Sequence, residues 1–174
     1  LFEGLRCVGV EYVQGGAVRR ARAEHEVVVC AGTIESPKLL MLSGIGPAAA
    51  LARLAIEPRV DLPGVGENLH DHVLAPVIFA ARDTVPPPLQ GLQPLHAHLF
   101  RRTRSGLERP DIQPLFFHLP LYAEDQDGPP DGFTLMGGAI RPVSRGSLRL
   151  ASADPEAGPL LDPACLTSDD DLEA

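Results

Sequence analysis

The chain has 174 residues, 44% of them hydrophobic and 22% charged, and it carries a formal net charge of -8 at pH 7. This length allows one domain or parts of two, and this apolar content can fill a core, which excludes a disordered chain. The acidic balance argues against a nucleic-acid partner, because no basic stripe is present to neutralise phosphates. The one dense basic cluster, Arg101, Arg102 and Arg104, is expected to be a solvated loop face.

Cysteine content and hydropathy indicate the compartment. Cys7, Cys30 and Cys165 are odd in number and widely spaced, which favours neither a disulfide framework nor a zinc site. No apolar run reaches the roughly 20 residues that span a bilayer, so we expect no transmembrane segment. Of 15 basic residues only Lys38 is a lysine, a bias typical of GC-rich bacterial genomes. We therefore expect a cytoplasmic bacterial protein, whose oligomeric state the sequence leaves open.

The first predicted elements are a β-hairpin and a buried strand. Val8, Val10 and Tyr12 alternate with smaller or polar residues, Gly15-Gly16 supplies the turn, and 17–23 returns as an Arg-rich partner strand. The next segment, Val27 to Cys30, is apolar at every position rather than alternating. This pattern predicts a strand covered on both faces, as in a parallel sheet with helices on each side.

A compact series of turns follows this predicted strand. Ser36 and Pro37 predict the N-cap and first position of a short helix, and Ser43-Gly44 predicts its end. The apolar residues expected on its buried side are Leu39, Leu40 and Leu42. A second helix is predicted after Gly46-Pro47 and before Pro58, directing Leu51, Leu54 and Ile56 toward the core.

Ala31-Gly32 lies where the predicted strand ends. In open parallel sheets ligands bind outside the carboxyl ends of the strands, and small residues let a ligand approach the backbone. The alternative is that this glycine serves only a turn.

The second half of the chain predicts an antiparallel sheet without crossover helices. Strand-like patterns occupy 112–119, 133–140 and 147–150, with Pro- and Gly-rich turns between them. Pro86 to Pro88 are expected to form a stiff connector rather than a ligand for an aromatic groove.

Both ends of the sequence predict an internal segment of a larger protein. A parallel neighbour for the strand at 27–30 requires a crossover helix, which does not precede it. At the other end Thr167 or Ser168 is a predicted N-cap, and Asp169 to Asp171 suit the positive end of a helix dipole. The sequence stops at Ala174, before such a helix completes two turns.

Three sequence blocks carry a family resemblance. The first resembles the second signature of the glucose-methanol-choline (GMC) family of flavin oxidoreductases at each defined position; it reads Gly32-Thr33-x-x-Ser36-Pro37-x-Leu39-Leu40-x-x-Ser43-Gly44-Ile45-Gly46. The second, 62–72, is similar to the LPGVGxNLxDH segment of that family, with His70 where many relatives have glutamine. The third, 141–150, followed by Asp154-Pro155 and 161–163, is similar to the start of the family's C-terminal region.

The resemblance implies an α/β fold class: part of a Rossmann-like FAD-binding domain over 1–72, joined to part of an antiparallel-sheet (α+β) substrate domain over 73–174. It also implies FAD as the cofactor. The positions that it assigns to FAD contact are Ala31, Gly32, Thr33, Asn68 and His72. For His72 the alternative is a hydrogen-bonded structural residue where two domains meet. The glycine-rich dinucleotide fingerprint and the catalytic histidine of the family match no position here, so no catalytic residue is named.

The implied activity is that of a larger enzyme, choline-dehydrogenase-like, which oxidises the CH–OH group of a small alcohol to a carbonyl by hydride transfer to the flavin. Residues 1–174 alone are expected to be inactive. One alternative is a non-redox lyase that keeps the same FAD fold. The other is a noncatalytic binding domain that uses the strand-rich second half and is indifferent to FAD.

Two further patterns have simple interpretations. His70-x-His72 and His96-x-His98 place imidazoles on one side of extended backbone, but we expect no metal site because no carboxylate lies at a matching offset around His96. Phe116, Phe117 and Met136 are expected to pack in a core, with lining of a substrate pocket as the alternative.

Overall fold

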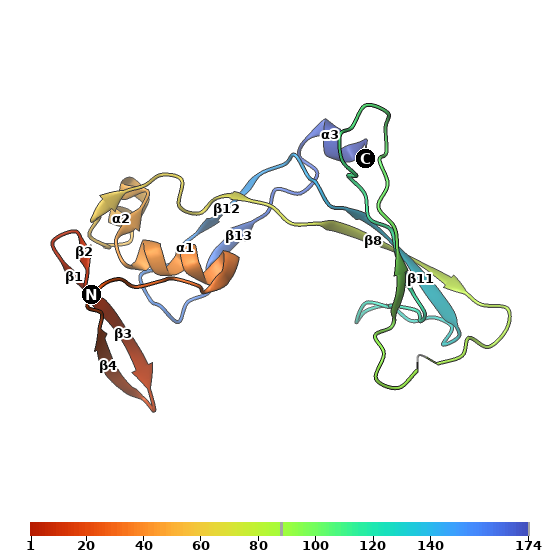
Figure 1. Cartoon of the computed structure of the whole chain (residues 1–174), viewed down its shortest axis with the longest axis horizontal. Helices are drawn as coiled ribbons and strands as arrows, with labels where there is room; N and C mark the ends of the chain where they lie inside the picture. Colours follow the sequence, from red (N-terminus) through yellow and green to blue (C-terminus); the bar gives the residue numbers. More distant parts are fainter. Residues whose placement is uncertain (88, 174) are drawn as a thin grey trace. The chain divides into compact units, whose positions relative to one another are not determined.

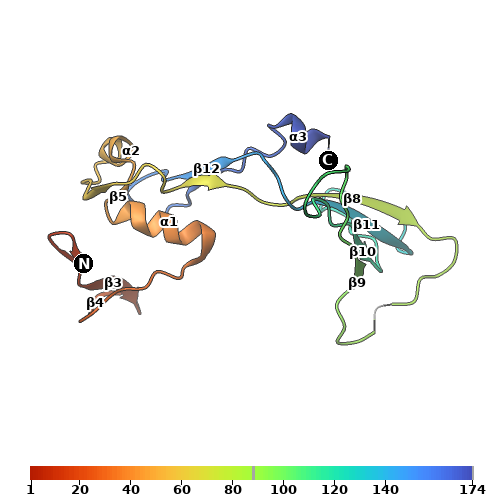
Figure 2. The same ribbon diagram turned by 45° about the horizontal axis from the view of Figure 1, so that its top comes forward.

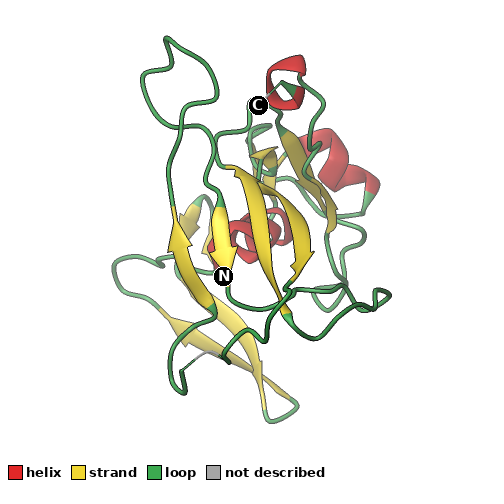
Figure 3. Cartoon of the chain, turned by 90° about the vertical axis from the view of Figure 1, so that its right-hand side faces the viewer, coloured by secondary structure: helices red, strands yellow, loops and turns green. Residues whose placement is uncertain are grey.

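The computed structural model describes residues 1–87 and 89–173, so Pro88, the last residue of the expected proline connector, lies outside the described residues. The chain divides into two compact units. The first consists of Leu1–Asn68 with Ser147–Leu161, and the second consists of Leu69–Gly146 with Asp162–Ala174. Figure 3 distinguishes the helices, in red, from the strands, in yellow.

The first unit begins with two hairpins. β1 (Phe2–Glu3) pairs with β2 (Arg6–Cys7), and β3 (Gly9–Gln14) pairs antiparallel with β4 (Ala17–Arg22), as Figure 1 shows. Gly15 and Gly16 form the turn at φ +60° and +75°, the left-handed values that a tight two-residue hairpin turn requires. The predicted hairpin is confirmed.

The strand predicted at Val27 to Cys30 is wrong for this chain. Residues 26–30 form neither strand nor helix, and Val28 is 68% exposed. A strand is defined by backbone hydrogen bonds to a neighbour, and this segment has no strand partner within the described residues. The apolar side chains of 27–30 would suit a strand buried between two layers. Apolar character alone does not form a strand, because a strand also needs a neighbouring strand to bond with.

Helix α1 (Gly32–Leu42) starts earlier than predicted, because Ser36 does not cap it. Instead the Ser36 hydroxyl oxygen accepts a hydrogen bond from the amide of Ala31 at 3.1 Å, and Pro37 lies inside the helix. The buried residues of α1 are Lys38 and Met41; of the three leucines expected inward, Leu42 packs against the core and Leu40 is half-buried, but Leu39 is 45% exposed, so the expectation is wrong for Leu39.

The C-terminus of α1 agrees with the sequence. Ser43 is the C-cap, and Gly44 follows at φ +85°. A Cβ atom on Gly44 would lie 2.6 Å from the carbonyl oxygen of Glu57, so both the backbone conformation and the space demand glycine.

The core of the first unit lies between α1, α2 (Ala48–Arg53) and β12 (Gly146–Arg149). Its buried side chains are Met41, Leu51, Leu148 and Leu150, against which Leu54 and Ile56 pack. Leu51 is only 1% exposed, so the predicted second helix and its inward residues are confirmed. The Asp61 carboxylate accepts the amide hydrogen of Ala48 at 2.9 Å and so serves the first turn of α2.

Two small sheets complete this part of the fold. β5 (Ile45–Gly46) pairs parallel with β6 (Val60–Asp61). β12 lies between β13 (Leu160–Asp162) and β7 (Glu67–Leu69). The Arg149 guanidinium pairs with the Glu67 carboxylate and donates a hydrogen bond to the carbonyl oxygen of Gly66, which links the second sequence block to the third.

The second unit is built on a four-stranded sheet. Its strands are β8 (Val73–Ala80), β11 (Gly132–Ala139), β10 (Leu115–Phe117) and β9 (Leu95–His98), in that spatial order, and each pair is antiparallel (Figure 2). No helix connects them within the described part of 73–139. The predicted antiparallel sheet without crossover helices is therefore confirmed.

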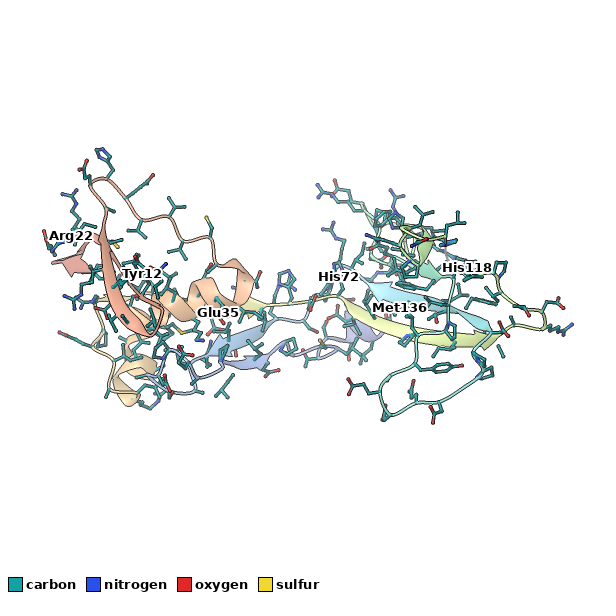
Figure 4. The ribbon with its side chains drawn as sticks, turned by 90° about the horizontal axis from the view of Figure 1, so that it is seen from below. Tyr12, Arg22, Glu35, His72, His118 and Met136 are labelled. Carbon is teal, nitrogen blue, oxygen red and sulfur yellow. The ribbon has the colours of Figure 1, made fainter. Side chains whose placement is uncertain are left out.

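The register of this sheet separates the three candidate pocket residues. Phe116 pairs with Leu135, while Leu115 pairs with Met136 and Phe117 with Thr134. Paired residues share a face and successive residues alternate, so Phe117 and Met136 lie on one face and Phe116 lies on the other. The Phe116 ring packs against that of Phe133 at a centroid distance of 5.7 Å. Figure 4 marks Met136 on the sheet.

A last short helix, α3 (Asp169–Leu172), belongs to the second unit. Ser168 is its N-cap residue and Asp169 to Asp171 form its first turn, so the predicted helix start is confirmed.

Candidate functional site

The N-terminal end of α1 has the features of a ligand-facing backbone. Ala31, Gly32 and Thr33 are all exposed, and Gly32 has φ +82°. A Cβ atom placed on Gly32 would meet no other atom within 4 Å, so the glycine is required by its conformation and leaves open space beside the backbone.

The electrostatics of this helix end favour a negative or strongly polar group. No side chain caps the helix at Ala31 within the described residues. The first amides of a helix point outward without intrahelical acceptors, and the helix dipole makes this end partly positive. An exposed end of this kind can bind an anion or a carbonyl oxygen through its amides.

Asn68 and His72 come from the second sequence block, and both are exposed. Asn68 lies on β7 in the first unit with φ +60°, a left-handed conformation that asparagine tolerates better than most residues. His72 belongs to the second unit, where its amide donates to the Asp71 carboxylate at 2.8 Å. This hydrogen bond gives the Asp71 carboxylate a partner on the neighbouring residue. The assignment of Ala31 to Thr33, Asn68 and His72 to one cofactor site stays a prediction.

The histidines of the second unit interact in other pairs than the sequence spacing indicated. The rings of His96 and His118 lie 4.6 Å apart between centroids, and Nδ1 of His98 lies 3.2 Å from Nε2 of Gln113. Within the described residues no group of three or more His, Cys, Asp and Glu side chains is placed to hold a metal ion.

The second unit contains a charged cavity of about 820 Å³ that the sequence did not reveal. Arg104, Arg109 and Arg141 line it together with Asp111 and Asp170. Arg101, Arg102 and Arg104 are all exposed, as predicted, and the Arg104 guanidinium in addition pairs with the Asp170 carboxylate at 3.2 Å. Nearly equal numbers of cationic and anionic groups leave the cavity without a strong preference for ligand charge.

Two carboxylates beside this cavity are held ionised. The hydroxyl of Ser144 lowers the pKa of Asp171 most, and the amides of Val143 and Ser144 lower it further, against the opposing effect of burial. Burial alone would raise the pKa of Asp111, but hydrogen bonds from the Thr103 hydroxyl and amide outweigh it and the pKa is lowered. Both groups act as structural acceptors.

Sequence reasoning missed the contact of Ser144 with Asp171. The two residues belong to blocks with separate signals, the RPxSRG segment and the acidic start of a helix, and no local spacing connects them. Only the folded chain brings them together.

No helix in the described part of the chain is long and apolar enough to span a membrane.

Comparisons with known proteins agree with the three sequence blocks. The sequence profile of the GMC oxidoreductase family matches residues 1–74. Human mitochondrial choline dehydrogenase is 39% identical to this chain, in an alignment that covers 99% of this chain and 33% of the relative. Choline oxidase of Arthrobacter globiformis is 41% identical, in an alignment that covers 93% of this chain and 30% of the relative. The chain thus spans about a third of these relatives.

Solved structures give the same result for the fold. Pyridoxine 4-oxidase of Mesorbium loti has a TM-score of 0.89 and 32% identity, covering 99% of this chain and 34% of that structure. A variant of formate oxidase of Aspergillus oryzae, solved to study the modification of its FAD, has a TM-score of 0.83 and 26% identity over 95% of this chain and 38% of that structure. The expected α/β fold class is confirmed, and the chain is similar to GMC oxidoreductases, whose family profile matches residues 1–74.

Proposed function

We propose that the whole protein carrying this chain is an FAD-dependent oxidoreductase that converts the CH–OH group of a small alcohol to a carbonyl. The observation that carries this proposal is the similarity along nearly the entire chain to choline dehydrogenase and choline oxidase, with 39% and 41% identity. FAD supplies the hydride acceptor of such a reaction.

The residues present fit a flavin dinucleotide. Gly32 offers an exposed backbone with open space where a Cβ would stand, at the positive end of an 11-residue helix. Gly32 and Thr33 would hold the cofactor through their amides, which lie in the first turn, whereas the Ala31 amide already donates to the Ser36 hydroxyl and Ala31 would contribute only a small side chain beside the cofactor. Asn68 and His72 would contribute polar side chains from the second block.

A choline-like alcohol is the substrate class that we favour. Several relatives are named for choline, whereas structural relatives are named for pyridoxine and formate, so the family fold accommodates different small substrates. The catalytic base is expected in a part of the whole protein that these 174 residues do not include.

Purification of the whole protein tests the proposal. Its yellow colour should arise from FAD, identified by chromatography of the released cofactor, and anaerobic choline should bleach the flavin absorbance near 450 nm at a rate that other small alcohols do not exceed. A protein that retains FAD but bleaches with no alcohol would support a lyase of the same fold. A folded protein without flavin would support a noncatalytic domain.

Two subsidiary proposals concern organisation and location. We propose that residues 1–72 belong to the FAD domain and most of 73–174 to the substrate domain, with Ser147–Leu161 packed in the first unit. Limited proteolysis near residue 72 would test this division. A cytoplasmic location is supported by the free thiols of Cys7, Cys30 and Cys165, and fractionation of the source cells would test it.

A further inference from the structure

One face of the four-stranded sheet is purely apolar. It has no polar side chain at the paired positions of the described strands, which are Val73, Ala75, Val77, Phe79, Ala97, Phe116, Phe133, Leu135, Gly137 and Ala139. Val77 is 54% exposed and Leu135 is 42% exposed. An apolar surface of this kind needs cover from other polypeptide. The whole protein is expected to provide it, because the chain spans about a third of its relatives.

The opposite face of the sheet, the mixed face, carries a row of side chains that begins at His98. His98 pairs with Leu115, and Leu115 pairs with Met136, so these three residues share the mixed face across three neighbouring strands (Figure 2). Phe117 lies on the same face, two residues after Leu115. Ligand pockets are lined mainly by apolar side chains with a few fixed polar groups, which is the composition of this face.

Two polar side chains occupy paired positions of the mixed face, Thr134 and His98. Thr134 is fully buried, and its hydroxyl accepts the amide of Leu121 and donates to the carbonyl oxygen of Leu119. His98 is exposed. His98 is therefore the polar group that the mixed face can present to a ligand.

Gln113 fixes the position of the ring hydrogen of His98. Nε2 of Gln113 lies 3.2 Å from Nδ1 of His98. An amide nitrogen only donates, so Nδ1 of the neutral imidazole accepts this hydrogen bond and Nε2 carries the hydrogen. In the described part of the chain no group accepts a hydrogen bond from Nε2. The Phe100 ring packs against the imidazole at a centroid distance of 5.3 Å and restricts its rotation.

We propose that His98 binds the substrate by donating a hydrogen bond from Nε2 to its oxygen atom, with Gln113 as the positioning residue that fixes the ring. This inference rests on the proposed function. When the base expected elsewhere in the whole protein removes the hydroxyl proton, negative charge develops on that oxygen, and a preorganised donor stabilises it. Leu115, Met136 and Phe117 would contact the apolar part of the alcohol.

Three variants of the whole protein separate the donor from packing. His98→Phe keeps a planar ring and removes the Nε2–H group, whereas His98→Gln keeps an amide donor. Gln113→Met removes the positioning hydrogen bond and keeps an unbranched side chain. His96→Phe is the matched control, because it makes the same change at another exposed histidine of β9, whose ring contacts His118 instead. Circular dichroism and flavin content verify that each variant folds.

The probes are two ligands that differ only in the hydroxyl group. Choline has this group, and ethyltrimethylammonium lacks it. Anaerobic bleaching of the flavin at increasing choline concentration gives the limiting rate and the Kd for choline, and competition gives the Kd for ethyltrimethylammonium. If another alcohol bleaches the flavin faster than choline, that alcohol and its deoxy analogue are used.

The expected results follow from the loss of one donor. His98→Phe should lower the ratio of limiting rate to Kd for choline by about a hundredfold, the lower end of the range for removing a donor to a developing oxyanion. His98→Gln should recover most of this loss, Gln113→Met should lie between His98→Phe and wild type, and His96→Phe should match wild type. The Kd for ethyltrimethylammonium should be the same in all variants, because this ligand offers no oxygen to the donor.

Contrary results separate the inference from the proposed function. An unchanged ratio in His98→Phe, an equal loss in His96→Phe, or a parallel loss of affinity for ethyltrimethylammonium would overturn the role of His98 and leave the proposed function intact. Wild-type behaviour of Gln113→Met would overturn its positioning role. Should His98→Phe fail to fold, His98→Gln and Gln113→Met decide. A wild-type flavin that no alcohol bleaches would overturn the proposed function, and the inference with it.

Discussion

The carboxylate of Asp171 accepts hydrogen bonds from both the amide and the hydroxyl of Ser144, 27 positions earlier in the chain. Its other oxygen accepts the amide of Val143 at 2.6 Å. The Ser144 hydroxyl oxygen in turn accepts the amides of Thr167 and Ser168 at 3.0 Å. Five hydrogen bonds therefore fix α3 against the segment that follows β11, and all of them pass through two buried side chains.

Replacement of Asp171 by alanine should release α3. The change leaves buried amide donors unpaired, which costs about 1–3 kcal/mol for a buried polar group. Hydrogen exchange of the Val143 and Ser144 amides in the whole protein should accelerate markedly. Asp169→Ala on the same helix is the control, because Asp169 forms none of these bonds. Equal protection in the two variants would contradict the role given to Asp171.

The same carboxylate predicts a pH dependence of stability. The folded-state pKa of Asp171 lies below the ordinary value of 3.8, so the ionised form stabilises the fold. This contribution is complete above the unfolded pKa and is lost as the pH falls from about 4 through the folded pKa, because the unfolded chain then binds the proton more readily. Urea unfolding from pH 6 to pH 2.5 should show a shallower acid loss for Asp171→Asn than for wild type. Parallel pH profiles would refute this assignment.

The sequence predicted those elements whose determinants are local. Gly15-Gly16 and Gly44 require left-handed backbone, and Leu51 lies on a short helix bounded by two prolines, so each signal was sufficient by itself. The predicted start of α1 was wrong because Ser36-Pro37 matches the N-terminal pattern of a helix. In the structure α1 already begins at Gly32, and the Ser36 hydroxyl accepts the amide of Ala31.

Elements that depend on distant partners were missed. β8 was not predicted, since Pro76 interrupts an apolar stretch that lacks turn signals. Proline is tolerated at this position because β8 is an edge strand of the sheet. The candidate cofactor positions were inferred from the resemblance of two sequence motifs to a known family, because hydrophobic periodicity does not identify a cofactor contact. The sequence could not reveal the charged cavity, because its lining comes from four separate segments.

Gly44 should be far less tolerant of substitution than Gly158. Gly44→Ala combines a left-handed φ of +85° with a Cβ only 2.6 Å from the Glu57 carbonyl oxygen, whereas a Cβ on Gly158 would meet nothing within 4 Å. We expect Gly44→Ala to lower the free energy of unfolding by at least about 1–3 kcal/mol, the range for strained backbone, and Gly158→Ala to change it by less than about 0.5 kcal/mol. Thermal unfolding of the whole protein measures both. Similar melting temperatures would show that the helix end adapts to a side chain.

Gly32 offers the sharpest test of the cofactor position. Gly32→Ala introduces a methyl group into open space at φ +82°, so it adds backbone strain of about 1 kcal/mol without a clash inside the chain. Gly15→Ala, at φ +60° and also without neighbours within 4 Å, imposes a similar strain in the β3–β4 hairpin and serves as the matched control. If FAD approaches the backbone at Gly32, the methyl group must displace it, and the Kd for FAD should rise by about tenfold or more in Gly32→Ala alone. Equal loss of affinity in both variants would indicate a general effect of strain, and unchanged affinity in Gly32→Ala would move the cofactor away from this end of α1.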